Sequence, residues 1–246
     1  MNLGIVKSIF KREFRAYFST PIALVFLVVF LVLSGFFTFK MGGFFERGQA
    51  DLRAFFAWHP WLYLFIVPAL SMRLWAEEKR TGTIELLLTL PIRLSEALLG
   101  KFLAAWAFIG FSLLMTFPIV LTVGYLGEPD YGVIIAGYLG SLLMAGAFLA
   151  VGMAISSMTK NQIISFVVSV SVCLFLILLG FEPLVNSFYK VLPDWFSRHL
   201  LNLSIPYHFE SIQRGVIEAA DVIYFLSLMA VSLMISGVVL ENERGN

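Results

Sequence analysis

The chain has 246 residues, of which 59% are hydrophobic and only 13% are charged. Its mean hydropathy of +0.89 excludes an ordinary water-soluble globular domain. The net charge of +1 gives no basic field for nucleic acid, and a single cysteine cannot form an intramolecular disulfide. Because the apolar residues stand in long runs, the sequence predicts an all-α integral membrane protein.

Residues 1–20 predict an amino-terminal helix that lies at the membrane surface. Its apolar residues fall about one helical turn apart, with basic residues between them, which is typical of an interfacial helix. The apolar residues are Ile5, Ile9, Phe10, Phe14 and Phe18, and the basic residues are Lys7, Lys11, Arg12 and Arg15. Thr20 and Pro21 then mark the start of a new helix.

Residues 21–246 predict a transmembrane domain of six crossings. The first run, Ile22 to Phe39, has no charge and would span about 27 Å of hydrocarbon. The second run contains Pro60 and Pro68, and its Arg73 is expected to snorkel to the membrane surface. The last four runs lack Asp, Glu, Lys and Arg. The expected crossings are 22–39, 58–76, 102–126, 132–156, 162–180 and 222–240.

The segment 181–221, between the last two crossings, is expected outside the membrane as short surface helices, because prolines and mixed polar residues interrupt it. Small residues in the fourth crossing, such as Gly137, Gly140 and Gly152, predict close helix packing there.

The distribution of basic residues predicts that both termini are cytoplasmic. Of the 17 Lys and Arg residues, 11 lie on the amino-terminal side of the predicted crossings and six on the other. The 11 are Lys7, Lys11, Arg12, Arg15, Arg73, Lys79, Arg80, Arg93, Lys101, Lys160 and Arg244.

The cytoplasmic segment 77–101 carries most of the functional information. Thr81 or Thr83 can cap a short helix in which Ile84 and neighbouring leucines share a face, and Pro91 ends that helix. Because short linkers join this helix to two crossings, any movement of the helix would move both crossings. An ordinary amphipathic loop helix is the alternative that the pattern leaves open.

This segment resembles the motif EE-x-x-x-GT-x-E-x-LL-x-x-P-[IV] of ABC-2 type permeases, in which it forms a coupling helix that docks on an ATPase subunit. The resemblance covers Glu77 to Ile92 and implies a role in coupling for Glu77, Glu78, Gly82, Thr83, Glu85, Leu86, Leu87 and Pro91.

The resemblance also assigns individual roles within the segment. Gly82 and Thr83 would form the turn, and Glu85 would face the ATPase or the amino-terminal helix. Leu86, Leu87 and Pro91 would pack against the bundle. Glu77 and Glu78 would pair with basic residues of the amino-terminal connecting helix, namely Lys11, Arg12 or Arg15.

Two further stretches are similar to the gliding-motility (Gld) branch of that family. The first consists of residues 8–14 and 18–22. The second consists of residues 207–217 and 221–226 and contains His208, Arg214 and Gly215. The resemblance implies a type V exporter arrangement in the bacterial inner membrane, with two ATPase subunits and a second permease subunit, identical or related. ATP and Mg²⁺ would bind to the ATPase, and this chain would bind no cofactor. A periplasmic accessory protein is a possible further partner.

Other functions have less support in the sequence. Gly100-Lys101 is followed by Phe102 and has Ser95 where the first glycine of a phosphate-binding loop belongs, so ATP hydrolysis is expected in a separate chain. The histidines, His59, His199 and His208, lack metal-ligand spacing and are expected in solvated or interfacial places.

The alternatives are mechanotransmission to a periplasmic partner, a non-ABC carrier or scaffold, and a membrane enzyme; the transported substrate is not assigned.

Overall fold

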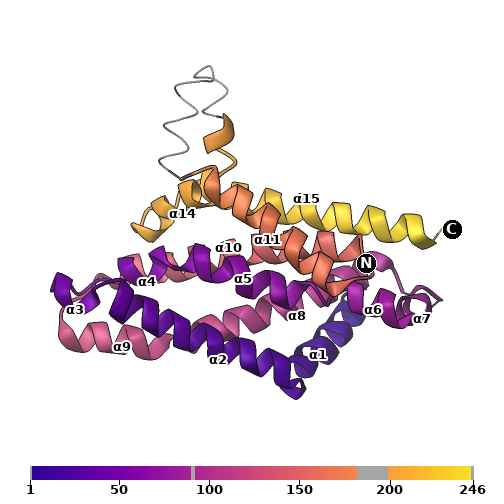
Figure 1. Ribbon diagram of the computed structural model, residues 1–246, viewed down its shortest axis with the longest axis horizontal. Coiled ribbons are helices and arrows are strands. Elements are labelled where there is room, and N and C mark those ends of the chain that lie inside the picture. Colours follow the sequence, from indigo (N-terminus) through magenta and orange to yellow (C-terminus); the bar gives the residue numbers. More distant parts are fainter. Residues whose placement is uncertain (1, 90–91, 182–198, 245–246) are drawn as a thin grey trace.

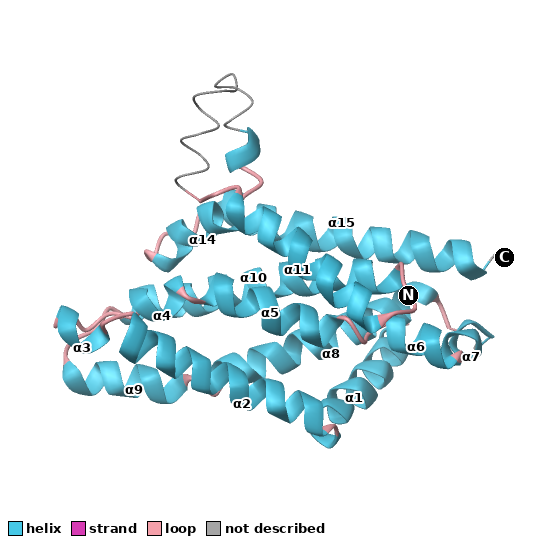
Figure 2. Ribbon diagram, in the orientation of Figure 1, coloured by secondary structure: helices cyan, strands magenta, loops and turns pink. Residues whose placement is uncertain are grey.

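The computed structural model of the chain describes residues 2–89, 92–181 and 199–244. Within these ranges the regular structure is entirely helical, as the composition predicts (Figure 2). The elements are α1 (Leu3–Ser19), α2 (Pro21–Phe36), the π-helix η1 (Phe37–Met41), α3 (Phe44–Arg47), α4 (Arg53–Ala57), α5 (His59–Ser71), α6 (Ala76–Thr81), α7 (Thr83–Thr89), α8 (Leu94–Leu114), α9 (Phe117–Leu126), α10 (Tyr131–Ser157), α11 (Gln162–Leu178), α14 (Ile205–Gln213) and α15 (Ala219–Arg244).

The long helices lie side by side along the longest axis of the molecule (Figure 1). The helices α3, α4, α9 and α14 lie toward one end, while α6, α7 and both chain termini lie toward the other. At the centre is α10, which contacts α5, α8, α11, α14 and α15.

Four helical stretches in the described residues are long and apolar enough to cross a membrane. They are Ala23–Glu46, Leu94–Leu126, Tyr131–Ser157 and Ala219–Glu243. The chain is therefore a multi-pass membrane protein. The helices α11 and α5 occupy the fifth and second predicted crossings but have only 17 and 13 residues, so the count of six crossings stays a prediction.

The second predicted crossing ends earlier than its apolar run. The sequence predicts a passage to Ala76, but α5 ends at Ser71 and residues 72–75 form a turn before α6. Pro68 lies inside α5 and has no backbone N–H to donate, which weakens the helix just before its end. The helix thus ends about one helical turn before the predicted boundary.

Small residues let neighbouring helices approach α10 closely, as the sequence predicts. A Cβ atom added to Gly152 would lie 2.0 Å from Ser71 Oγ, and one added to Gly140 would lie 2.5 Å from Ile212 Cγ2. Neither distance is compatible with van der Waals contact. The central helix therefore depends on the absence of side chains where α5 and α14 cross it.

The amino-terminal helix α1 packs along α8 instead of meeting only lipid and water. The rings of Tyr17 and Phe108 stack with centroids 4.9 Å apart, and Ile9 covers Gly100. Part of the apolar face that the sequence assigns to the membrane surface is therefore covered by protein. The basic residues Lys11 and Arg15 are exposed.

The prediction of a solvated or interfacial environment is wrong for His59. Its ring is fully buried, stacks on Tyr63, and places Nδ1 2.9 Å from Ser141 Oγ. Phe55 and Phe56 pack edge-on against the same ring. The aromatic residues of α4 and α5 exclude solvent from this position, so His59 belongs to the core.

Candidate functional site

The candidate site is the segment between α5 and α8, which the sequence predicts as a coupling element. Its first part is fixed to the last turn of α10 by the hydroxyl of Ser156. This oxygen accepts the backbone N–H groups of Trp75 and Ala76 at 3.2 and 3.0 Å, and the hydroxyl donates to the carbonyl of Met72 at 3.0 Å. Because Trp75 is also fully buried, the start of α6 is anchored in the bundle.

A tight turn separates α6 from α7 at the predicted position. Gly82 has a φ of 75°, in the left-handed region that favours glycine, and ends α6. The hydroxyl of Thr81 donates to the carbonyl of Glu77 at 2.9 Å and lies 3.0 Å from the Thr83 hydroxyl. The glycine sets the direction in which α7 leaves α6.

The second helix of the segment, α7, begins at Thr83, with Ile84 buried and Glu85 exposed. Leu86 and Leu87 belong to this helix, but their side chains lie outside what the structure describes. Pro91, which the sequence predicts as its end, also lies outside the described residues; the helix itself ends at Thr89.

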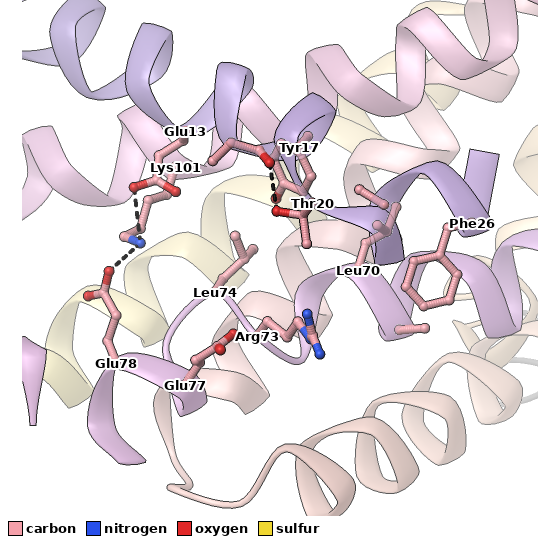
Figure 3. Close-up of a pocket in the computed structure, with 13 residues that line it drawn as sticks. Glu13, Tyr17, Thr20, Phe26, Leu70, Arg73, Leu74, Glu77, Glu78 and Lys101 are labelled. Carbon is pink, nitrogen blue, oxygen red and sulfur yellow. Dashed lines mark hydrogen bonds and ion pairs between the residues drawn. The ribbon is translucent and has the colours of Figure 1, made fainter. Parts of the chain in front are cut away.

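A buried lysine connects the segment to the rest of the molecule (Figure 3). The side chain of Lys101, on α8, is only 4% exposed, and its Nζ lies 2.6 Å from Glu78 and 3.5 Å from Glu13. It also lies 5.3 Å from the ring of Trp75. Glu13 in turn pairs with Arg12 at 2.6 Å. The cluster joins α1, α6 and α8, and its charges balance.

These contacts correct the pairing that the resemblance implies. Glu78 pairs with Lys101 and not with Lys11, Arg12 or Arg15, and within the described residues Glu77 has no ion pair within 4.0 Å. The reason is that α1 turns Glu13 toward α8 and leaves Lys11 and Arg15 in solvent. Glu13 stands out in the sequence as a carboxylate on a basic helix, and Lys101 as a lysine just before an apolar run, but neither feature identifies the partner.

A second buried lysine, which the sequence analysis does not single out, fixes the other side of α6. The side chain of Lys79 is 2% exposed and donates to the carbonyl of Ser157 and to the carboxylate of Glu243. It therefore ties α6 to the ends of α10 and α15. Together, Lys79, Ser156 and Lys101 join this short helix to three of the long helices.

At the opposite end, His208 anchors α14 to α15, in keeping with a structural role for this histidine. Its Nδ1 is 2.7 Å from the Asp221 carboxylate, its Nε2 donates to the Asn202 carbonyl at 3.0 Å, and its ring stacks on Tyr224. Ser211 donates to the same carboxylate. Both ring nitrogens and the serine hydroxyl are thus occupied by structural contacts.

The other two residues of the predicted external motif have different environments. Arg214 is exposed and pairs with Glu210 at 3.3 Å along α14. Gly215 has a φ of 89°, and a Cβ atom there would lie 2.8 Å from Val133 Cγ2. It therefore permits both the turn before α15 and the close approach to α10.

Metal binding has no support within the described ranges, where no group of three or more His, Cys, Asp or Glu side chains is arranged to hold an ion.

Comparison with protein families matches residues 7–243 to one described as ABC-2 family transporter protein. A search of curated proteins gives no match. The match spans nearly the whole chain, which therefore belongs to the ABC-2 family of transporter proteins.

Proposed function

We propose that this chain is the membrane-spanning permease subunit of an ATP-binding cassette exporter. In this proposal, α6 and α7 form the contact with a separate ATPase subunit, which binds ATP and Mg²⁺. The observation that carries it is the attachment of α6 to α8, α10 and α15 by Lys101, Ser156 and Lys79. A passive linker would need none of these buried contacts.

Two permease subunits and two ATPase subunits would form the working complex. Closure of the ATPase dimer would push on α7, and the buried contacts of α6 would pass that displacement to the long helices. The second permease subunit is either an identical or a related chain. The narrower resemblance to the Gld branch remains part of this proposal.

We place the protein in a bacterial inner membrane with both termini in the cytoplasm. The excess of Lys and Arg on the amino-terminal side supports this orientation. So does the position of α6, α7 and both termini toward one end of the bundle (Figure 1). The ATPase would then meet α7 on the side where ATP is available.

The purified chain is expected to hydrolyse no ATP by itself, because its sequence has no phosphate-binding loop. Affinity purification from the native cells should recover a second chain with ATPase activity. The measurement is phosphate release by the isolated chain in nanodiscs and by the co-purified complex. Turnover by the isolated chain that survives a second purification step would refute the assignment.

Cysteine labelling should locate Thr83 in the cytoplasm and Gln49 outside. Both residues are exposed, and replacing the buried Cys173 by alanine removes the background thiol. In intact cells a membrane-impermeant maleimide should label Gln49→Cys and spare Thr83→Cys until the cells are opened. Labelling of Thr83→Cys in intact cells would reverse the orientation and separate α7 from any cytoplasmic ATPase.

A further inference from the structure

A cleft of about 300 Å³ opens beside the Lys101 cluster, between α1, α2, α5 and α6 (Figure 3). One part of its wall is polar and includes Thr20, Arg73 and Glu77. The other part is apolar and includes Phe26 and Leu70. The cleft thus has one polar wall and one apolar wall, a lining that complements an amphiphilic ligand.

Two charged groups in this cleft have no ion-pair partner. Lys101 is satisfied by Glu13 and Glu78. Arg73 and Glu77, in contrast, form no ion pair within 4.0 Å with any residue that the structure describes. Arg73 Nε is also buried without a hydrogen-bond partner. Both side chains extend into the same cleft (Figure 3), so it offers one cation and one anion to a ligand.

The apolar part of the cleft lies at the start of a membrane span, because Phe26 belongs to the apolar stretch Ala23–Glu46. The crevice beyond it, past Phe30 and Phe108, has a volume of only about 10 Å³, which is too small for an acyl chain. A ligand chain that passes Phe26 and Leu70 would therefore continue in the bilayer.

We propose that the cleft binds the headgroup of one phospholipid of the bilayer, and that this headgroup is zwitterionic. Its phosphate would meet Arg73, whose planar guanidinium can donate two parallel hydrogen bonds to phosphate oxygens. Its ammonium group would meet Glu77, and one acyl chain would lie along Phe26 and Leu70. A headgroup with negative charge only would leave Glu77 unpaired beside a phosphate. This inference does not depend on the ATPase partner.

Native mass spectrometry with phosphatidylethanolamine and phosphatidylglycerol of the same acyl chains tests the proposal. The wild-type chain should retain phosphatidylethanolamine preferentially. Arg73→Gln should lower its apparent affinity about tenfold or more, because a charge-assisted bond to phosphate is lost. Glu77→Gln should weaken phosphatidylethanolamine and remove the preference over phosphatidylglycerol. Arg80→Gln, an exposed arginine on α6 outside the cleft, is the matched control and should change neither.

A steric variant separates lipid binding from folding. Ala16→Trp would place an indole in the cleft from the exposed side of α1 and leave both charges in place. It should lose the bound phosphatidylethanolamine while thermal unfolding in detergent stays cooperative. Equal retention of the two lipids by the wild-type chain, or unchanged retention in Arg73→Gln, Glu77→Gln and Ala16→Trp, would overturn the proposal.

Discussion

Gly82→Val is expected to abolish ATPase stimulation while the transmembrane bundle stays folded. The residue has a φ of 75°, which a β-branched side chain tolerates poorly, at a cost of about 1–3 kcal/mol. A Cβ atom there would meet nothing within 4 Å, so the strain is confined to the backbone. The turn is expected to relieve it by changing the direction of α7, which would misplace the proposed contact with the ATPase.

A matched series separates the turn from the surface of α7. Gly82→Asn should retain most of the stimulation, because asparagine accepts the left-handed conformation. Glu85→Arg should weaken binding of the ATPase, since a reversed charge at an interface costs several kcal/mol. The measurements are co-purification of the ATPase and its rate of hydrolysis. Lys40→Ala, at an exposed position of the π-helix η1, is the negative control. Full stimulation in both Gly82→Val and Glu85→Arg would reduce the segment to a plain linker.

Lys101→Met is expected to destabilise the protein by about 3 kcal/mol, the range found when one partner of a buried ion pair is removed. The ammonium group holds Glu78 at 2.6 Å and Glu13 at 3.5 Å, and Glu78 Oε2 is already buried without a hydrogen bond. Without the lysine, two partly buried carboxylates would face each other, with only Arg12 left to balance their charge. The contact between α1 and α6 should therefore loosen.

Denaturant unfolding followed by tryptophan fluorescence measures this effect, because Trp75 lies against the lysine. Lys11→Met, on the exposed face of α1, removes the same charge and should be nearly neutral. Adding Glu78→Gln to Lys101→Met should recover part of the loss, since residues that share a contact are not additive. If the single and double variants lose equal stability, the ion pair is not the source of the effect.

The membrane-spanning character of the chain could be predicted because hydrocarbon imposes a minimum length on an apolar helix. The turn at Gly82 was predicted from the resemblance to the ABC-2 motif, and its left-handed backbone conformation suits a glycine. The end of α5 was not, because an apolar run continues past the point where the helix stops at Ser71. Composition determines where a helix can cross a bilayer, but it does not determine where the helix ends.

The ion pairs of the site could not be predicted, because they depend on how helices far apart in the sequence pack. Glu78 had several basic residues of α1 as plausible partners, and only the docking of α1 on α8 selects Lys101. The burial of His59 has the same origin, because its ring is enclosed by aromatic residues that come into place only when the bundle forms.

The contacts of Ser156 restrict the rotational freedom of the whole segment. Its hydroxyl is bonded on both sides of the turn, to Met72 before α6 and to Trp75 and Ala76 at its start. These hydrogen bonds prevent bending between α10 and the start of α6, so α6 is held rigidly against the end of α10. Any rotation of α7 relative to the bundle must then occur at Gly82 or beyond. The lever arm is thus one short helix, and a displacement of α7 would reach α8, α10 and α15 through the buried contacts of α6.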